Sequence, residues 1–298
     1  MTVGATGIHP DCYGCLINQA RSTARQAGLN RTQAQDVLDA ALRWILIARY
    51  NPLQVQHIVR HIADETLKIL GNKDADIYAA IKKQSHEIAL SFVDSFHKQM
   101  QASHSPLETG LRIAAAGNII DFGAKDHASL DLHKELSAID QLQFGRYDIH
   151  EFLVRISKAR NLLYICDNAG EIVFDRLLMK QIKTEYPNVQ ITAAVRHSAI
   201  INDATLEDAQ LAELHPFANV ISSGSVYPGT ILNECSGMFQ NLYSHADLII
   251  SKGQGNFETL LNYGDKRVFF LLRIKCETMA HIAQQKKGDL VFMQGTCK

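Results

Sequence analysis

Two short segments of the sequence place carboxylate and amide side chains directly after apolar runs. Asp167 and Asn168 follow the run 161–166, and Asp203 lies in the loop after the run 190–195. Carboxylate and amide oxygens are the ligands that hard divalent cations prefer. The segments therefore predict a site for Mg²⁺, Mn²⁺, Co²⁺ or Ni²⁺ made by these three residues. A strand-to-helix turn with a helix cap is the alternative explanation for the Asp-Asn pair.

A basic, glycine-rich segment, Lys252-Gly-Gln-Gly-Asn256, follows a further apolar run. Two glycines let backbone N–H groups approach an anion closely, and a lysine adds a point charge. We predict that Lys252, Gly253 and Asn256 bind phosphate, joined by Arg196 if its side chain turns inward. The segment is neither a Walker A loop nor a dinucleotide-binding fingerprint. Its alternative explanation is close packing of a helix on a strand.

Together these groups predict metal-assisted hydrolysis of a phosphomonoester. Cationic and N–H groups would stabilise the charge that develops on phosphate oxygens. We assign catalytic roles to Asp167, Glu171 and Lys252. Glu171 lies within about one helical turn of Asp167 and could orient the attacking water or accept its proton. A mechanism in which Asp167 itself attacks phosphorus stays open.

The elements that must position these residues change in character near residue 160. Residues 1–159 are predicted to form an all-helical region. Its helices are expected at 14–27, 33–48, 52–70, 76–101, 106–117, 129–141 and 147–158. In residues 160–298, apolar strands alternate with helices. These strands are expected at 161–166, 190–195, 219–222, 247–251, 267–272 and 289–293.

This alternation predicts an α/β domain with a Rossmann-like, mainly parallel sheet flanked by helices, against which the helical region packs. Ligands bind such sheets beyond the carboxyl ends of the strands. The predicted metal and phosphate residues all follow strands, so we expect them to meet at one edge of the sheet.

Composition and charge narrow the class of protein. The chain has 298 residues, of which 46 % are hydrophobic, and its 30 basic and 31 acidic residues nearly balance. We therefore expect a globular protein that binds neither nucleic acid nor a membrane. A small phosphorylated metabolite is the partner expected from the predicted phosphate site. No apolar stretch of about 18 residues predicts a membrane span, and the first residues lack the pattern of a secretory signal. The expected location is cytoplasmic, and the oligomeric state is not predicted.

Cysteines and histidines suggest three further sites. Cys12 and Cys15 form a Cys-x-x-Cys pair, to which Cys276 could add a third thiolate if the N-terminus folds back. A redox-active dithiol or two inert thiols are the alternatives. His57 and His61 are spaced to share a metal, although a solvated helix face explains them as well. His197 is either a substrate contact or an ordinary loop residue.

Four motifs occur in an order that resembles a known family. They are Asp167-Asn168-Ala169-Gly170-Glu171, the segment 200–205, the segment 252–260 and Lys275-Cys276. They resemble the damage-control phosphatase family, long called domain of unknown function 89, over essentially the whole chain. Cys12-Tyr-Gly-Cys15 and the segment 116–123 resemble its stand-alone microbial branch.

The resemblance implies a divalent-metal-dependent phosphatase that acts on sugar phosphates or damaged phosphorylated cofactor precursors. It also implies that Asp167, Asn168 and Asp203 bind the metal and that Lys252 binds phosphate. The family often has proline shortly before the Asn-Asp pair, where this chain has Ala199, which predicts a looser loop around Asp203.

Asn118 and Asp121 lie outside the predicted sheet domain. We predict that Asn118 contacts substrate, with a helix end as the alternative. Two other functions stay open at this point. One is a nucleotide-dependent kinase or transferase, and the other is a non-enzymatic regulatory module that binds metal and phosphate.

Overall fold

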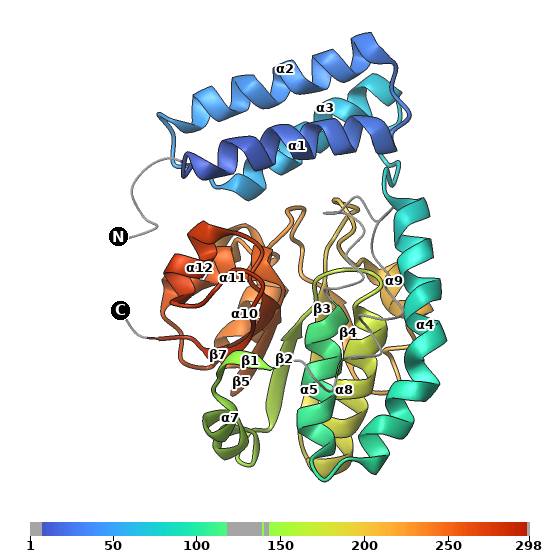
Figure 1. Cartoon of the computed structure of the whole chain (residues 1–298), viewed down its shortest axis with the longest axis vertical. Helices are drawn as coiled ribbons and strands as arrows, with labels where there is room; N and C mark the ends of the chain where they lie inside the picture. The colour runs from blue at the N-terminus through green and yellow to red at the C-terminus, as the bar shows by residue number, and fades with distance from the viewer. Residues whose placement is uncertain (1–7, 118–138, 140–142, 297–298) are drawn as a thin grey trace.

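The computed structural model describes residues 8–117, 139 and 143–296. Three N-terminal helices form a separate layer above the rest of the molecule: α1 (Asp11–Gln26), α2 (Arg31–Ala48) and α3 (Val55–Leu70) (Figure 1). α2 begins where Asn30 and Gln33 each accept a hydrogen bond from the other's backbone N–H. The three helices share an apolar core of their own, and we call them the cap.

A seven-stranded sheet forms the centre of the larger part. Its strands are β1 (Phe144–Tyr147), β2 (Asn161–Ile165), β3 (Gln190–Val195), β4 (Asn219–Ser222), β5 (Leu248–Lys252), β6 (Val268–Arg273) and β7 (Leu290–Gln294). The spatial order is β1-β7-β6-β5-β2-β3-β4. Only the β6–β7 pair is antiparallel. The predicted Rossmann-like, mainly parallel sheet is therefore confirmed.

Helices cover both faces of this sheet, because its central strands are apolar on both sides. One face carries α4 (Ala79–Ala102), α5 (Pro106–Ala116), α7 (Ile149–Ile156) and α8 (Ile172–Glu185). The other carries α10 (Gly237–His245), α11 (Gln254–Leu260) and α12 (Glu277–Ala283). α9 (Leu206–Leu211) contacts β4, and the 3₁₀ turns are η4 (Leu232–Glu234) and η5 (Leu261–Tyr263).

The hydrophobic cores do not follow the division at residue 160 that the helical periodicity predicts. α4 and α5 contribute to the same apolar core as α8 and the strand residue Tyr164. The predicted domain boundary at residue 160 falls between two members of this shared core, Ala159 and Leu162, although Arg160 itself is exposed. Within the described residues, α3 is the last helix that contributes to the separate core of the cap.

The chain before α7 also departs from expectation. The helix predicted at 147–158 is shorter and follows a strand, β1, that the sequence pattern did not indicate. The helix predicted at 129–141 lies largely outside the described residues.

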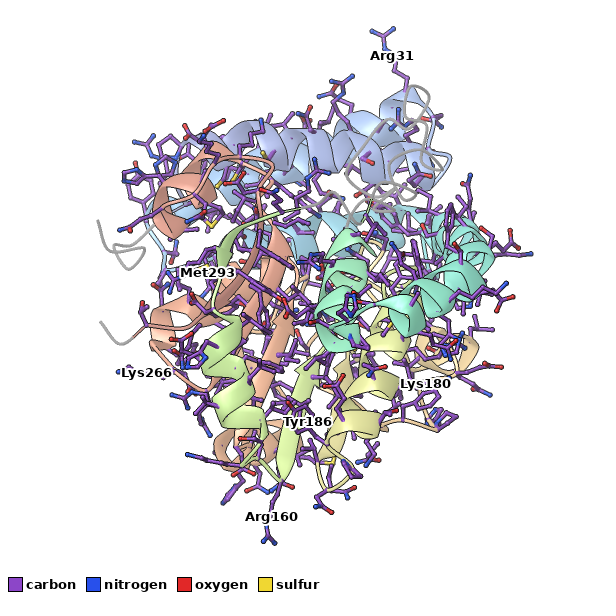
Figure 2. All side chains as sticks on the ribbon, turned by 60° about the horizontal axis from the view of Figure 1, so that its bottom comes forward. Arg31, Arg160, Lys180, Tyr186, Lys266 and Met293 are labelled. Atoms are coloured by element: carbon purple, nitrogen blue, oxygen red, sulfur yellow. The ribbon has the colours of Figure 1, made fainter. Side chains whose placement is uncertain are left out.

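Charged side chains project from the surface around the whole molecule. Arg31, Arg160, Lys180 and Lys266 mark its periphery in Figure 2 and are exposed. Across the described residues, no helix combines the length and the apolar character needed to cross a membrane.

Candidate functional site

Backbone hydrogen bonds join the two loops that carry the predicted metal ligands. The loops follow β2 and β3, which are neighbours in the sheet. The N–H of Ala204 donates to the carbonyl of Asp167 at 2.7 Å, and Asn168 and Asp203 form an isolated antiparallel bridge. Asp167, Asn168 and Asp203 are 7 %, 6 % and 1 % exposed. The structure thus brings all three predicted ligands together at the carboxyl edge of the sheet.

Arg196 turns inward, as its predicted role requires. It directly follows β3 and is 1 % exposed. Its Nε donates to Oδ2 of Asp203 at 2.6 Å, and its guanidinium lies 3.9 Å from Oδ1 of Asp167. A buried guanidinium therefore stands between the two carboxylates, where it orients Asp203.

Lys252 lies at the same edge, but its ammonium group is already engaged. Its Nζ donates to Oε1 of Glu171 at 2.5 Å, to Oδ1 of Asp175 at 2.6 Å and to the carbonyl of Ala114 at 3.0 Å. An ammonium has three N–H donors, so these bonds use all of them. The phosphate-binding role predicted for Lys252 would require one of the three to break.

Asp175 is a site residue that the sequence reasoning missed. It is fully buried on α8, and besides Lys252 it accepts a hydrogen bond from the hydroxyl of Tyr164 at 2.7 Å. Burial raises the pKa of Asp175 to about 6, against the opposing effect of Lys252. One signal was present: Asp175 lies one helical turn after Glu171, within an otherwise apolar helix face.

Gly253 sits against the carboxylate of Asp167. Its φ is +78°, a conformation that favours glycine, and a Cβ at this position would overlap the carboxylate group itself. The second glycine, Gly255, has a different reason: its Cβ would come 2.5 Å from the carbonyl oxygen of Pro228. Close packing therefore explains Gly255, whereas Gly253 shapes the wall of the candidate metal site.

Asn256 is fully buried, and both ends of its amide are engaged. Its Oδ1 accepts from Arg196 at 3.0 Å and from the hydroxyl of Thr230 at 2.8 Å. Its Nδ2 donates to the carbonyls of Cys166 and Lys252. Asn256 thus ties together the ends of β2, β3 and β5, and its predicted contact with phosphate stays a prediction.

The charge of the cluster fits a divalent cation. Four fully or nearly fully buried carboxylates face two buried cationic side chains; they are Asp167, Glu171, Asp175 and Asp203 against Arg196 and Lys252. Burial, with the nearby carboxylates of Asp203 and Glu171, raises the pKa of Asp167 well above its usual range. A bound cation would relieve this crowding of like charges. Two carboxylates and the amide of Asn168 also supply the oxygen donors that such an ion requires.

The Asp167–Glu171 turn packs tightly against the neighbouring helices. A Cβ on Gly170 would come 2.7 Å from Cβ of Ser85 on α4, and one on Gly117 would come 2.6 Å from Cγ of Glu171. The end of α5 therefore lies beside the site. Asn118 and Asp121, which follow it in the chain, lie outside the described residues.

A cavity of about 630 Å³ opens between α3, α4 and the loop that carries Asp203. Both ends of that loop line it, at His197 and Thr205, together with Arg60, Lys73 and Lys83. The same wall also carries acidic side chains, so its charge alone does not select an anionic ligand; they are Asp74, Asp76, Glu207 and Asp208. His197 is exposed there, which leaves its predicted substrate contact open.

The N-terminus folds back toward Cys276, as the three-thiol hypothesis required. Oδ2 of Asp11 accepts a hydrogen bond from the hydroxyl of Thr278 at 3.1 Å, which joins the starts of α1 and α12. Burial raises the pKa of Cys12 to about 12, with smaller contributions from Glu258, Cys15 and Cys276. Within the described ranges, no three His, Cys, Asp or Glu side chains are arranged to hold a metal.

The two spaced histidines do not act as a pair. Nε2 of His57 lies 2.9 Å from Oε1 of Glu234 on the α/β side, so that this residue bridges the cap to η4. The ring of His61 stacks on Trp44, with the ring centroids 3.4 Å apart. A shared metal at these two positions has no support in this arrangement.

Comparisons with known proteins agree over nearly the whole chain. A family model described as the damage-control phosphatase ARMT1-like domain matches residues 8–291. A damage-control phosphatase of Pyrococcus horikoshii is 34 % identical over 295 residues, which are 98 % of this chain and 99 % of the relative. A damage-control phosphatase of Archaeoglobus fulgidus is 31 % identical over 287 residues, 95 % and 98 % of the two chains.

A solved structure agrees as well. The crystal structure of a DUF89 family protein from Pyrococcus horikoshii superposes with a TM-score of 0.84 at 33 % identity, and covers 97 % of this chain and 99 % of its own. The similarity therefore includes the cap, the sheet and the loops of the candidate site.

Proposed function

Because the chain belongs to the damage-control phosphatase family with the ARMT1-like domain, we propose that it hydrolyses phosphomonoesters of small metabolites with the help of a divalent cation. The observation that carries the proposal is the buried cluster at the carboxyl ends of β2, β3 and β5. Its carboxylates outnumber its cations, and Asp167, Asn168 and Asp203 present oxygen donors. A bound divalent cation neutralises phosphate charge and lowers the pKa of a water molecule.

The residues of the chain have distinct roles in this proposal. Arg196 holds Asp203 through its Nε and is the buried cation nearest to Asp167. It is therefore the residue best placed to stabilise the charge that develops on phosphate oxygens. Lys252 fixes Glu171 and Asp175 beneath the site, so that the carboxylates keep their places. Asp167 serves as a ligand, or as the nucleophile in the alternative mechanism.

The proposed substrate class rests on the family to which the chain belongs. We propose a sugar phosphate or a damaged phosphorylated cofactor precursor, the classes that the family resemblance implies; the cavity beside the loop of Asp203 offers space for such a molecule. We propose a cytoplasmic location for this activity. A kinase and a binding module are the competing functions, and neither is favoured by a feature of the site.

The test of the function is phosphate release from a generic aryl phosphate and from a panel of phosphometabolites. We expect exhaustive chelation to abolish turnover, and Mg²⁺, Mn²⁺, Co²⁺ or Ni²⁺ to restore it to different extents. A kinase would need a nucleotide donor, and a binding module would release no phosphate. Full activity after chelation, with no metal found by elemental analysis, would refute the role of the cation.

The Asp203→Asn variant tests the ligand set. The change preserves size but removes a negative charge, so we expect weaker Mn²⁺ binding by at least about tenfold, with activity partly recovered by excess metal. Calorimetric titration of Mn²⁺ alongside steady-state kinetics measures both. Asp39→Asn, at an exposed position of α2, is the control and should behave like the parent. Parental Mn²⁺ affinity in Asp203→Asn would exclude the role we assign to this carboxylate.

A further inference from the structure

The turn that carries Asp203 has an unusual backbone conformation. Ile201 has a φ of +41°, in the left-handed region, where a β-branched residue is a genuine outlier. The N–H of Asp203 donates to the carbonyl of Ile200 at 3.1 Å, which closes a β-turn. Asn202 does not share the positive φ of Ile201. A positive φ at the first central position of a β-turn normally belongs to glycine, asparagine or aspartate.

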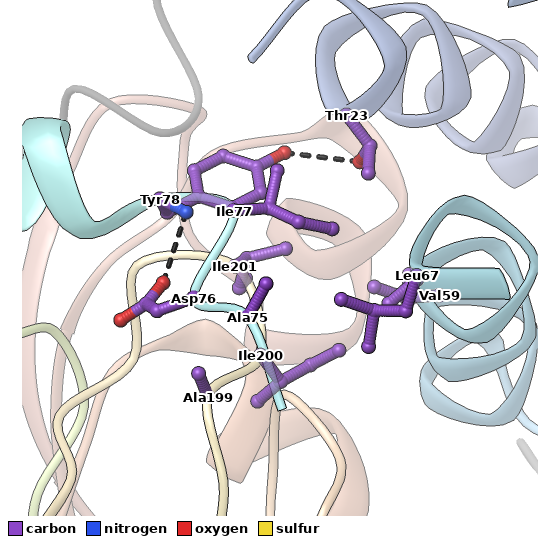
Figure 3. Close-up of a pocket in the computed structure, with 11 residues that line it drawn as sticks. Thr23, Val59, Leu67, Ala75, Asp76, Ile77, Tyr78, Ala199, Ile200 and Ile201 are labelled. Atoms are coloured by element: carbon purple, nitrogen blue, oxygen red, sulfur yellow. Dashed lines mark hydrogen bonds between the residues drawn. The ribbon is translucent and has the colours of Figure 1, made fainter. Parts of the chain in front are cut away.

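The cap supplies the packing that holds this turn. Ile200 is 2 % exposed and belongs to the apolar core of the cap, and Ile201 packs against the same core. Among the residues described, these two are the only members of that core from beyond α3. Figure 3 shows them among side chains of the cap and of the segment that leads into α4. The space left there is about 10 Å³, roughly that of one water molecule.

We infer that Ile201 is a positioning residue for the phosphatase site. Strained conformations persist only where the surrounding structure over-determines them, and here the cap does so by burying the two isoleucines. The turn passes directly into the site, because the N–H of Ala204 bonds to the carbonyl of Asp167. The cap thereby sets where Asp203 lies. The link to catalysis rests on the proposed function, in which Asp203 is a metal ligand.

Substitutions at Ile201 separate its packing from its backbone strain. Ile201→Gly suits the positive φ but removes the side chain from the cap. We expect the amides of Asp203 and Ala204 to exchange hydrogen at least about tenfold faster than in the parent. We also expect Mn²⁺ affinity to fall by at least about tenfold, as for other groups that orient metal ligands, with turnover largely recovered at saturating Mn²⁺. Ile201→Val keeps an apolar branched side chain and should stay within about threefold of the parent in both measurements.

Two further variants complete the experiment. Gln284 has a similar φ of +54° at the end of α12, so Gln284→Gly controls for the relief of strain alone. It should leave amide exchange at Asp203 and Mn²⁺ affinity unchanged. Val59→Ala loosens the cap beside the two isoleucines without altering the loop. In the folded protein it should accelerate hydrogen exchange of the amides of Asp203 and Ala204. It carries the test if Ile201→Gly does not fold.

Parental amide exchange at Asp203 and Ala204 in Ile201→Gly, or in Val59→Ala if the glycine variant does not fold, would overturn the inference. The exchange measurement needs no metal and no substrate. A parent protein that binds no Mn²⁺ and releases no phosphate would therefore refute the proposed function alone, while the exchange rates would still decide whether the cap sets this turn.

Discussion

Gly253→Ala is expected to lower turnover by at least about 100-fold, because the new methyl group would occupy the place of the Asp167 carboxylate. Gly253 follows β5 directly, and its N–H is bonded to the carbonyl of Leu271 at 3.1 Å, so that the strand end cannot easily retreat. Asp167 must then move. Displacing a reacting group by about 1 Å commonly costs about 100-fold in rate. Mn²⁺ affinity should fall with turnover, because the displaced group is a proposed ligand.

A second glycine with a positive φ controls for the addition of a methyl group away from the site. Gly71 follows α3 in the left-handed conformation, with φ +66° and ψ +17°, and a Cβ there would meet no atom within 4 Å, whereas Gly253 has φ +78° and ψ +162°. Gly71→Ala should therefore lose about 1–2 kcal/mol of stability, the cost of a left-handed residue, with turnover unchanged. If Gly253→Ala resembled this control in steady-state kinetics, the close approach of Gly253 to Asp167 would have no catalytic consequence.

Lys252→Met is expected to be among the most destabilising single changes in the protein. Methionine has a similar length, so the loss comes from charge: Glu171 and Asp175 would stay buried without their cation. Removing one partner of a buried ion pair typically costs about 3–5 kcal/mol in the free energy of unfolding. Urea denaturation at neutral pH measures this loss. Turnover of this variant should be expressed per folded molecule, after the folded fraction has been measured.

The pH dependence of this loss has a definite sign. The pKa of Asp175 is raised by burial even with Lys252 present, and without the lysine the folded protein would hold this proton more tightly. A carboxyl group whose pKa is raised on folding destabilises the native state in full above its folded pKa; the penalty shrinks as the pH falls below that value and vanishes below the unfolded pKa. The deficit of Lys252→Met relative to the parent should therefore shrink as the pH is lowered from 8 toward about 5.

Two comparisons decide whether the unpaired carboxylates are the cause. Adding Glu171→Gln and Asp175→Asn to Lys252→Met removes both charges and should recover a large part of the stability. Lys82→Met removes a second buried lysine, which forms ion pairs with Asp76 and Asp208. The side chains of these two residues are 26 % and 11 % exposed. It should lose less, because water reaches those carboxylates. A triple variant no more stable than Lys252→Met would contradict the charge explanation.

The sequence allowed the candidate metal ligands to be placed side by side because their positions depend on topology. Asp167 and Asp203 follow consecutive strands of a βαβ unit, and consecutive parallel strands usually pair, so their carboxyl ends meet. The same reasoning placed Arg196 and Lys252 at that edge. It could not reveal what Lys252 bonds to, because the burial of Asp175 depends on how α8 packs against Tyr164, a contact between elements.

Two features of the fold could not be read from periodicity for a related reason. The helical pattern of residues 1–159 is similar in the cap and in α4 and α5, and periodicity does not identify the surface that a helix covers. Strand β1 has four residues and pairs with β7 through an irregular register. Such a short segment does not show a clear alternation of apolar and polar residues. Ile201 was equally hidden, because its sequence predicts no positive φ.

The burial of Ile200 and Ile201 in the cap also limits how such a protein can diversify. Helical layers over α/β sheets look like modules that could be exchanged between relatives by recombination. Here Ile200 and Ile201 of the α/β part pack in the core of the cap, and they belong to the same loop as Asp203. A cap from another protein, with a cavity of different shape, would pack poorly against these isoleucines and would disturb the site below. The cap and residues 200–201 must therefore be inherited as one unit, although more than a hundred residues separate them in the chain.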